Sequence, residues 1–162
     1  MKVMPTLEGG LRIDVETATD WLVLEQIAPD ALQGGVEKLP DRLSALMDEE
    51  SGWDEVVIPE LREFFSGQLR KVAETVFRAQ GKVAPEEKDW DAEGRLFIER
   101  EDGAEWYGAL NQARLALERR YKFGPTQEVT SVESFPAAKR SAFIRSQFYC
   151  ALQSVLLEHV LD

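Results

Sequence analysis

The clearest helical pattern in the chain lies at residues 59–81, PELREFFSGQLRKVAETVFRAQG. Apolar side chains recur there at steps of three and four residues, at Leu61, Phe65, Leu69, Val72 and Val76. This spacing places them on one face of an α-helix, and that face must pack against other elements. Pro59 suits the first position of a helix and Gly81 suits its end. The stretch therefore predicts an amphipathic helix from Pro59, within a mainly helical fold.

In other segments the apolar residues recur either at the spacing of a helix, every three or four residues, or at that of a strand, every second residue. Helices are expected at residues 17–28, from Pro40, at residues 104–123 with Asp102 as the cap, and from Pro136 to Leu161. Residues 11–15 and 95–99 are expected to be short strands. The sequence leaves open whether these strands pair as a ribbon or belong to two separate strand–helix units. The predicted fold is mainly α, a compact domain of about five or six helices with one short two-stranded β-ribbon if the strands pair.

The totals indicate one domain spanning residues 1–162, because a chain of 162 residues is long enough for one core. Hydrophobic residues make up 44% of the chain and charged residues 30%, which is typical of globular proteins. No apolar run is long enough to span a bilayer, and no secretory leader is visible. The expected location is therefore the cytoplasm, with no membrane association.

The charge is strongly negative and unevenly distributed. The net charge is −11, with 25 acids and 12 bases in residues 1–110 and 5 acids and 7 bases in residues 111–162. A negative field repels phosphate backbones, so nucleic acid is an unlikely partner for the whole chain. The basic last third nevertheless leaves a cationic face open.

Residue counts exclude several chemistries. Cys150 is the only cysteine and His159 the only histidine, so a disulfide within the chain and a zinc site built on these ligands are excluded. No glycine-rich phosphate loop is present. No catalytic residue, metal site or cofactor is predicted. Two acidic stretches, residues 48–55 and 86–93, read as solvated loops, with a divalent cation as the alternative.

Three polar residues are expected on helices that pack centrally: Asn111, Arg114 and Gln153. If they are buried they must be hydrogen-bonded, so they form either a structural network or a binding site. Arg119 and Arg120 fall in the last turn of their helix. They suit the helix dipole there, or an anionic or acidic partner, or nucleic acid.

The segment Trp106–Leu117, WYGALNQARLAL, resembles the bacterial family known as DUF2017. In that family a Leu-Asn pair precedes an Arg-Leu pair and a further Arg, which matches Leu110-Asn111, Arg114-Leu115 and Arg120 here. The aromatic, Leu and Gln residues of FYCALQ, residues 148–153, also resemble the family pattern. The resemblance implies a mainly helical fold and no known activity. Trp106 joins the candidate binding residues through this motif.

The sequence does not settle the function. The leading hypothesis is a non-enzymatic protein-interaction or regulatory domain, with a protein partner or a second copy as the ligand. One alternative is a small enzyme that uses carboxylates and a divalent cation. The other is a transcription-linked regulator that uses the basic C-terminal third, with Arg119, Arg120, Lys139 and Arg140 on one face.

Overall fold

The structure is a computed structural model that describes residues 1–32, 41, 43, 45–46, 53–81, 93–124 and 132–161. In chain order the elements are β1 (Lys2–Pro5), β2 (Leu11–Val15), α1 (Ala18–Glu25), α2 (Ile27–Leu32), α4 (Trp53–Ala79), β3 (Gly94–Ile98), the 3-10 turn η3 (Arg100–Asp102), α5 (Gly103–Tyr121), the 3-10 turn η5 (Val132–Ser134) and α6 (Ala137–His159). Most of the helix expected from Pro40 lies outside these residues. The fold is mainly α with a small β element.

The strands form one antiparallel sheet in the order β1-β2-β3. The two predicted strands do pair, with Ile13 opposite Leu96. A strand that the sequence pattern missed, β1, adds to the other edge of β2, with Val3 opposite Ile13. Alternate residues of β2 are fully buried, because that face of the sheet packs on the helices. The sheet therefore has three strands rather than the two expected.

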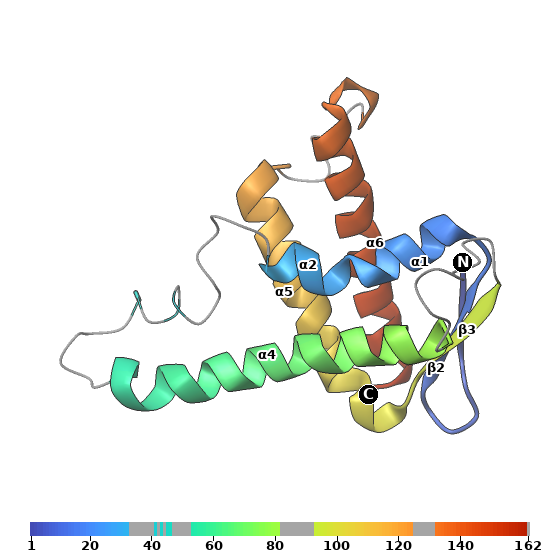
Figure 1. Cartoon of the computed structure of the whole chain (residues 1–162), viewed down its shortest axis with the longest axis horizontal. Coiled ribbons are helices and arrows are strands. Elements are labelled where there is room, and N and C mark those ends of the chain that lie inside the picture. Colours follow the sequence, from blue (N-terminus) through green and yellow to red (C-terminus); the bar gives the residue numbers. More distant parts are fainter. Residues whose placement is uncertain are drawn as a thin grey trace.

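The helices pack into one body with the sheet at one side (Figure 1). Helices α5 and α6 run antiparallel and in contact, while α2 and α4 both cross α5. The N-terminal part of α4 extends past α5, and its other end reaches the sheet. Trp106 and Tyr149 are the largest fully buried side chains of a core that draws on strands and helices alike.

Two helix starts differ from the sequence expectation. Helix α4 begins at Trp53, so Pro59 lies inside it rather than at its first position. The missing N–H of a proline removes one helical hydrogen bond. The additional turns are nevertheless held by packing, because Ile58, which precedes the proline, is only 3% exposed. The helix expected at residues 17–28 is divided into α1 and α2, and Pro29 occupies the first turn of α2, where its N–H is not needed.

The start and end of α5 also use other residues than expected. Asp102 makes no capping hydrogen bond. Its carboxylate instead lies 2.7 Å from the Lys71 ammonium and ties α5 to α4. At the other end, Lys122 adopts the left-handed conformation with φ of 48°, and its N–H donates to the Glu118 carbonyl oxygen. Glycine is the usual residue there, so the sequence pattern pointed to Gly124 instead.

We predict that Gly10→Ala destabilises the fold, because Gly10 lies where β2 meets β3. An added Cβ would lie 2.3 Å from the Ile98 carbonyl oxygen, which is backbone and cannot move aside. Urea denaturation should show a free energy of unfolding lowered by about 2 kcal/mol, as for other overpacked sites.

The matched control is Gly67→Ala in α4. Its added Cβ would meet nothing closer than the Arg70 side chain, at 3.9 Å. Because alanine favours helices, this variant should be unchanged or more stable by up to about 1 kcal/mol. Equal stabilities of the two variants would contradict the close approach at Gly10.

Candidate functional site

The polar residues expected on the central helices meet between α5 and α6. The Arg114 guanidinium donates through Nη1 to Gln153 Oε1. The Gln153 amide in turn donates to the Tyr107 carbonyl oxygen at 3.2 Å. Gln153 is 3% exposed, so these hydrogen bonds satisfy a buried amide and link the two helices. This part of the predicted set forms a structural network.

Asn111 and Trp106 take different positions from that network. The Asn111 side chain lines a pocket of about 160 Å³ together with Arg114, Ser146 and Phe143. Trp106 is fully buried in the core. Its ring therefore packs against other core side chains, and a surface contact for it is not available in this fold.

The basic residues of the last third gather at one end of the molecule. The C-terminal end of α5, with Arg119 and Arg120, and the N-terminal end of α6, with Lys139, lie together at the top of Figure 1. Several of these cations already have partners. Arg120 lies 5.3 Å from the Tyr121 ring centre, and the Lys139 ammonium donates to the Lys122 carbonyl oxygen at 3.2 Å.

A buried ionic cluster joins α2 to α6, and the sequence did not predict it. Arg145 on α6 donates to both carboxylate oxygens of Asp30 on α2, at 2.6 and 2.8 Å. The Tyr149 hydroxyl donates to the same carboxylate at 2.9 Å. The Asp30 side chain is 0% exposed. A buried charge is tolerated only with such complete pairing, so this cluster fixes the position of α2 on the helical body.

The pKa values of the two donors are both raised. Burial, followed by the nearby Asp30 charge, raises the pKa of Tyr149 far above its ordinary value of 10.0. The hydrogen bond with Asp30 raises the pKa of Arg145, which burial alone would lower. Both donors therefore stay protonated across the physiological range. In the sequence, this cluster is indicated only by two charged residues, Asp30 and Arg145, that have apolar neighbours along the chain.

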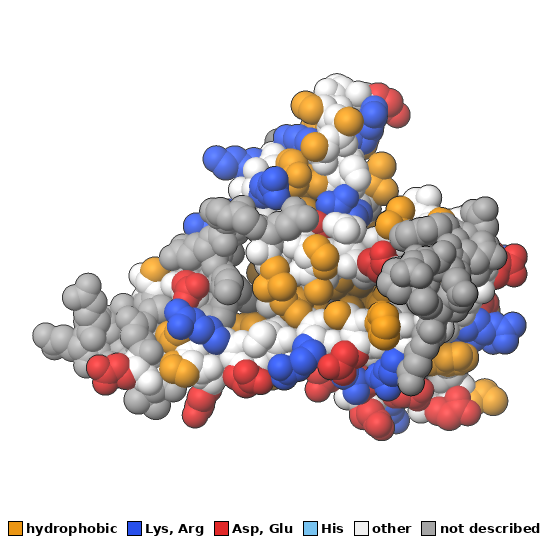
Figure 2. Space-filling view, in the orientation of Figure 1, with side chains coloured by type: hydrophobic (Ala, Val, Ile, Leu, Met, Phe, Trp, Pro, Cys, Tyr) orange, Lys and Arg blue, Asp and Glu red, His pale blue; other side chains and the backbone are white. Residues whose placement is uncertain are grey.

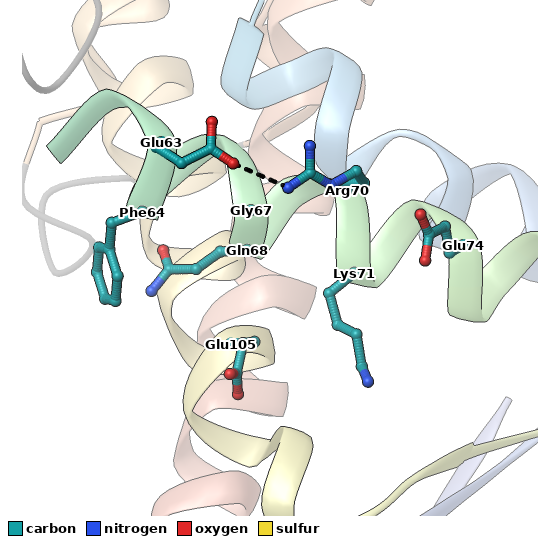
Figure 3. Close-up of a pocket in the computed structure, with 8 residues that line it drawn as sticks. All are labelled: Glu63, Phe64, Gly67, Gln68, Arg70, Lys71, Glu74 and Glu105. Atoms are coloured by element: carbon teal, nitrogen blue, oxygen red, sulfur yellow. Dashed lines mark hydrogen bonds and ion pairs between the residues drawn. The ribbon is translucent and has the colours of Figure 1, made fainter. Parts of the chain in front are cut away.

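A groove of about 400 Å³ lies where α4 crosses α5, and we take it as the candidate functional site (Figure 3). Its lining residues come mainly from the solvent-facing side of α4: Glu63, Phe64, Gly67, Gln68, Arg70, Lys71 and Glu74, with Glu105 from α5. The crossing is close because Gly108 on α5 has no side chain. A Cβ there would lie 2.3 Å from the Gln68 amide.

Neutral hydrogen bonds hold the two walls of this groove together. The Gln112 amide on α5 donates to Gln68 Oε1 at 2.9 Å and to the Phe65 carbonyl oxygen at 3.1 Å. Gln68 is 6% exposed, so its amide needs such a partner. Amide groups and Gly108 thus help to set the relative position of α4 and α5, together with the Lys71–Asp102 pair.

The charges of the groove are only partly paired. Arg70 donates to Glu63 at 3.1 Å, and Lys71 pairs with Asp102. Glu105 faces the space between Gln68 and Lys71 in Figure 3. Its Oε2 atom is shielded from solvent and has no hydrogen-bond partner. Leaving a buried acceptor without a donor costs roughly 1–3 kcal/mol of folding stability. Glu105 carries one such acceptor, its Oε2 atom.

Metal binding finds no support in the described part of the chain. Within it, no three His, Cys, Asp or Glu side chains come together in a way that could hold a metal ion. Most of the two acidic stretches, residues 48–55 and 86–93, lies outside it. Among the described helices, none combines the length and the apolar character needed to cross a bilayer.

The features above define a class of protein: a mainly helical domain with a small antiparallel sheet and a groove at a helix crossing. The comparisons with known proteins then give the family. A family model described as "Domain of unknown function (DUF2017)" matches residues 4–160, so the chain belongs to the DUF2017 family. The resemblance seen at Trp106–Leu117 is thereby confirmed. No curated protein and no solved structure matches the chain.

We predict that Arg145→Met lowers the free energy of unfolding by about 3 kcal/mol, because it leaves a buried carboxylate without its cation. Thermal and urea denaturation at neutral pH should both report the loss. Arg140→Met is the control, since Arg140 is an exposed arginine on the same helix. Its effect should stay below about 0.5 kcal/mol. Similar losses for both variants would show that the Asp30 contact contributes no stability.

Tyr149→Phe should give a stability difference that depends on pH. At neutral pH the variant loses a hydrogen bond to a charged acceptor, at a cost of roughly 1.5 kcal/mol. Folding raises the pKa of Tyr149. The stability that its hydroxyl contributes is therefore complete at any pH below the pKa of tyrosine in the unfolded state, near 10.0, and it falls as the pH rises above that value. Urea denaturation between about pH 8 and 11 should show the gap between wild type and variant closing. A gap that is constant with pH would contradict the raised pKa.

Proposed function

We propose that this protein is a non-enzymatic protein-interaction domain that binds its partner in the α4–α5 groove. The single observation that carries the proposal is an exposed aromatic side chain on the edge of a preformed groove. Phe64 is 59% exposed, although its ring is large and apolar. Aromatic side chains are enriched at protein interfaces, where a partner covers them.

The surroundings of Phe64 support a rigid docking surface. Its ring lies edge-to-face with that of Phe65, with 5.5 Å between the ring centres. The Phe65 carbonyl oxygen accepts the Gln112 hydrogen bond that joins α4 to α5. Rigid aromatic residues bind at a low cost in conformational entropy, because little freedom is lost.

The groove is a better candidate than the pocket between α5 and α6 or the basic end of the molecule. The pocket between α5 and α6 is smaller, at about 160 Å³, and its Arg114 already donates to Gln153. At the basic end, Arg120 lies against Tyr121 and Lys139 is engaged by the Lys122 carbonyl oxygen. The groove instead combines an exposed aromatic ring with unpaired charge. We also propose that the domain works in the cytoplasm, where its single cysteine, Cys150, needs no disulfide partner.

Site-specific photo-crosslinking tests this proposal. Phe64 is replaced by p-benzoylphenylalanine, and the variant is irradiated in the cells that produce the protein. We expect a discrete protein adduct, because the photoreactive ring would lie within the interface. Mass spectrometry of the adduct then tells a different protein from a second copy of the chain.

The control places the same photoreactive residue at Leu7, which is fully exposed in the turn between β1 and β2. This position should give no adduct or only weak, diffuse ones. The proposed function is wrong if position 64 gives no adduct, or if both positions give the same products. Circular dichroism of each variant confirms that the fold is retained.

A further inference from the structure

We infer that the α4–α5 groove binds a basic segment of another protein, which places an arginine or lysine side chain against Glu105. The inference rests on the proposed interaction function and specifies the chemistry of the partner. Three properties of the groove carry it: its uncompensated negative charge, the buried oxygen of Glu105, and a wall that suits the stem of a long basic side chain.

The first property is the uncompensated charge. Both bases of the groove are already engaged, Arg70 with Glu63 and Lys71 with Asp102. Glu74 and Glu105 have no cationic partner within hydrogen-bonding distance among the residues that the structure describes. With Asp102, which engages Lys71, four carboxylates stand against two cations here, an excess of two. An approaching basic side chain would gain from both, whereas an acidic one would be repelled.

The second property is the position of the Glu105 carboxylate. Its Oε2 atom is shielded from solvent and accepts no hydrogen bond. In Figure 3 the side chain lies beneath α4, between Gln68 and Lys71, at the inner side of the groove. The Lys71 ammonium nearby is held by Asp102. Glu105 as a whole is half-buried and lines the groove, so a ligand there can pair with its carboxylate, and a charged donor would do so best.

The third property is the shape of the wall. Gly67 has no side chain, so α4 leaves an opening between Phe64 and Arg70. The aliphatic stem of a lysine or arginine can lie along such a surface while its charged end reaches further in. Phe64, on the edge, offers a ring face on which a guanidinium can stack. Arginine fits better than lysine, because it can stack and also donate several hydrogen bonds.

A second copy of this chain is a weaker candidate for the occupant. One group of its basic residues lies at the shared end of α5 and α6, where Arg120 and Lys139 already contact Tyr121 and Phe135. Docking that end into the groove would also bring together two chains that each carry a net charge of −11. A separate basic segment avoids this repulsion.

The test uses two short peptides that differ only in charge: acetyl-Ala-Arg-Leu-Arg-Ala amide, and the same peptide with citrulline in place of each arginine. Each is titrated into the ¹⁵N-labelled full chain at low salt, and the backbone amide shifts are followed by NMR. The arginine peptide should shift residues of the groove on α4 and the region around Glu105. The citrulline peptide should bind more weakly by about tenfold, because it lacks the charge that strengthens the hydrogen bond.

Variants of the protein separate the groove from the general negative charge. Glu105→Gln and Glu74→Gln should each lower the affinity of the protein for the arginine peptide, and Glu105→Gln should lower it by about tenfold. Glu158→Gln removes the same charge from exposed α6 and should leave the affinity unchanged. Equal affinities for the two peptides would overturn the inference. So would shifts spread over the acidic surface, or equal effects of Glu105→Gln and Glu158→Gln.

The two experiments fail in different ways. A protein adduct at position 64 with no preference for the arginine peptide keeps the interaction function and overturns the basic ligand. An adduct that contains only a second copy of the chain overturns the basic partner in favour of self-association. An absent adduct removes the proposed function itself, even where the peptide binds.

Discussion

The position of the helices depends on one buried charge. Asp30 on α2 has no access to water, so it must meet a cation inside the protein, and Arg145 on α6 is that cation. Tyr149 supplies a further hydrogen bond from the same helix. This requirement anchors α2 against α6, and α2 in turn contacts both α5 and α4. The Asp30 cluster therefore holds α2 in place against both of the helices that form the groove.

Periodic patterns identified most of the elements, because period is a local property. The apolar residues of α4 and the alternation in β2 predicted a helix and a strand, and both are present. Lys2–Pro5 has no such alternation, and it becomes a strand only through pairing with β2. The contact between Asp30 and Arg145 joins positions 115 residues apart, so no local spacing could show it. Pro59 was misread because Ile58, which packs beside it, could not be placed from the sequence.

The candidate site was less accessible to sequence reasoning than the fold. Of the three polar residues expected to be hydrogen-bonded if buried, Asn111, Arg114 and Gln153, only Gln153 is buried, and it is hydrogen-bonded to Arg114. Asn111 instead lines a separate pocket. The groove was missed because its residues, such as Glu63 and Lys71, lie on the polar face of an amphipathic helix. Such a face normally contacts only solvent. Only the crossing of α5, which Gly108 permits, converts part of that face into a concave surface.

The amide contacts between Gln68 and Gln112 have a consequence for how such a groove responds to its surroundings. Neither amide titrates, and neither carries a net charge, so this contact between α4 and α5 is insensitive to pH and to ionic strength, unlike the Lys71–Asp102 ion pair. The carboxylates of the groove are the opposite, because dissolved ions screen their attraction for a cation. Dissolved ions can therefore weaken the attraction for a cation in the groove while the amide contacts between the two helices stay in place.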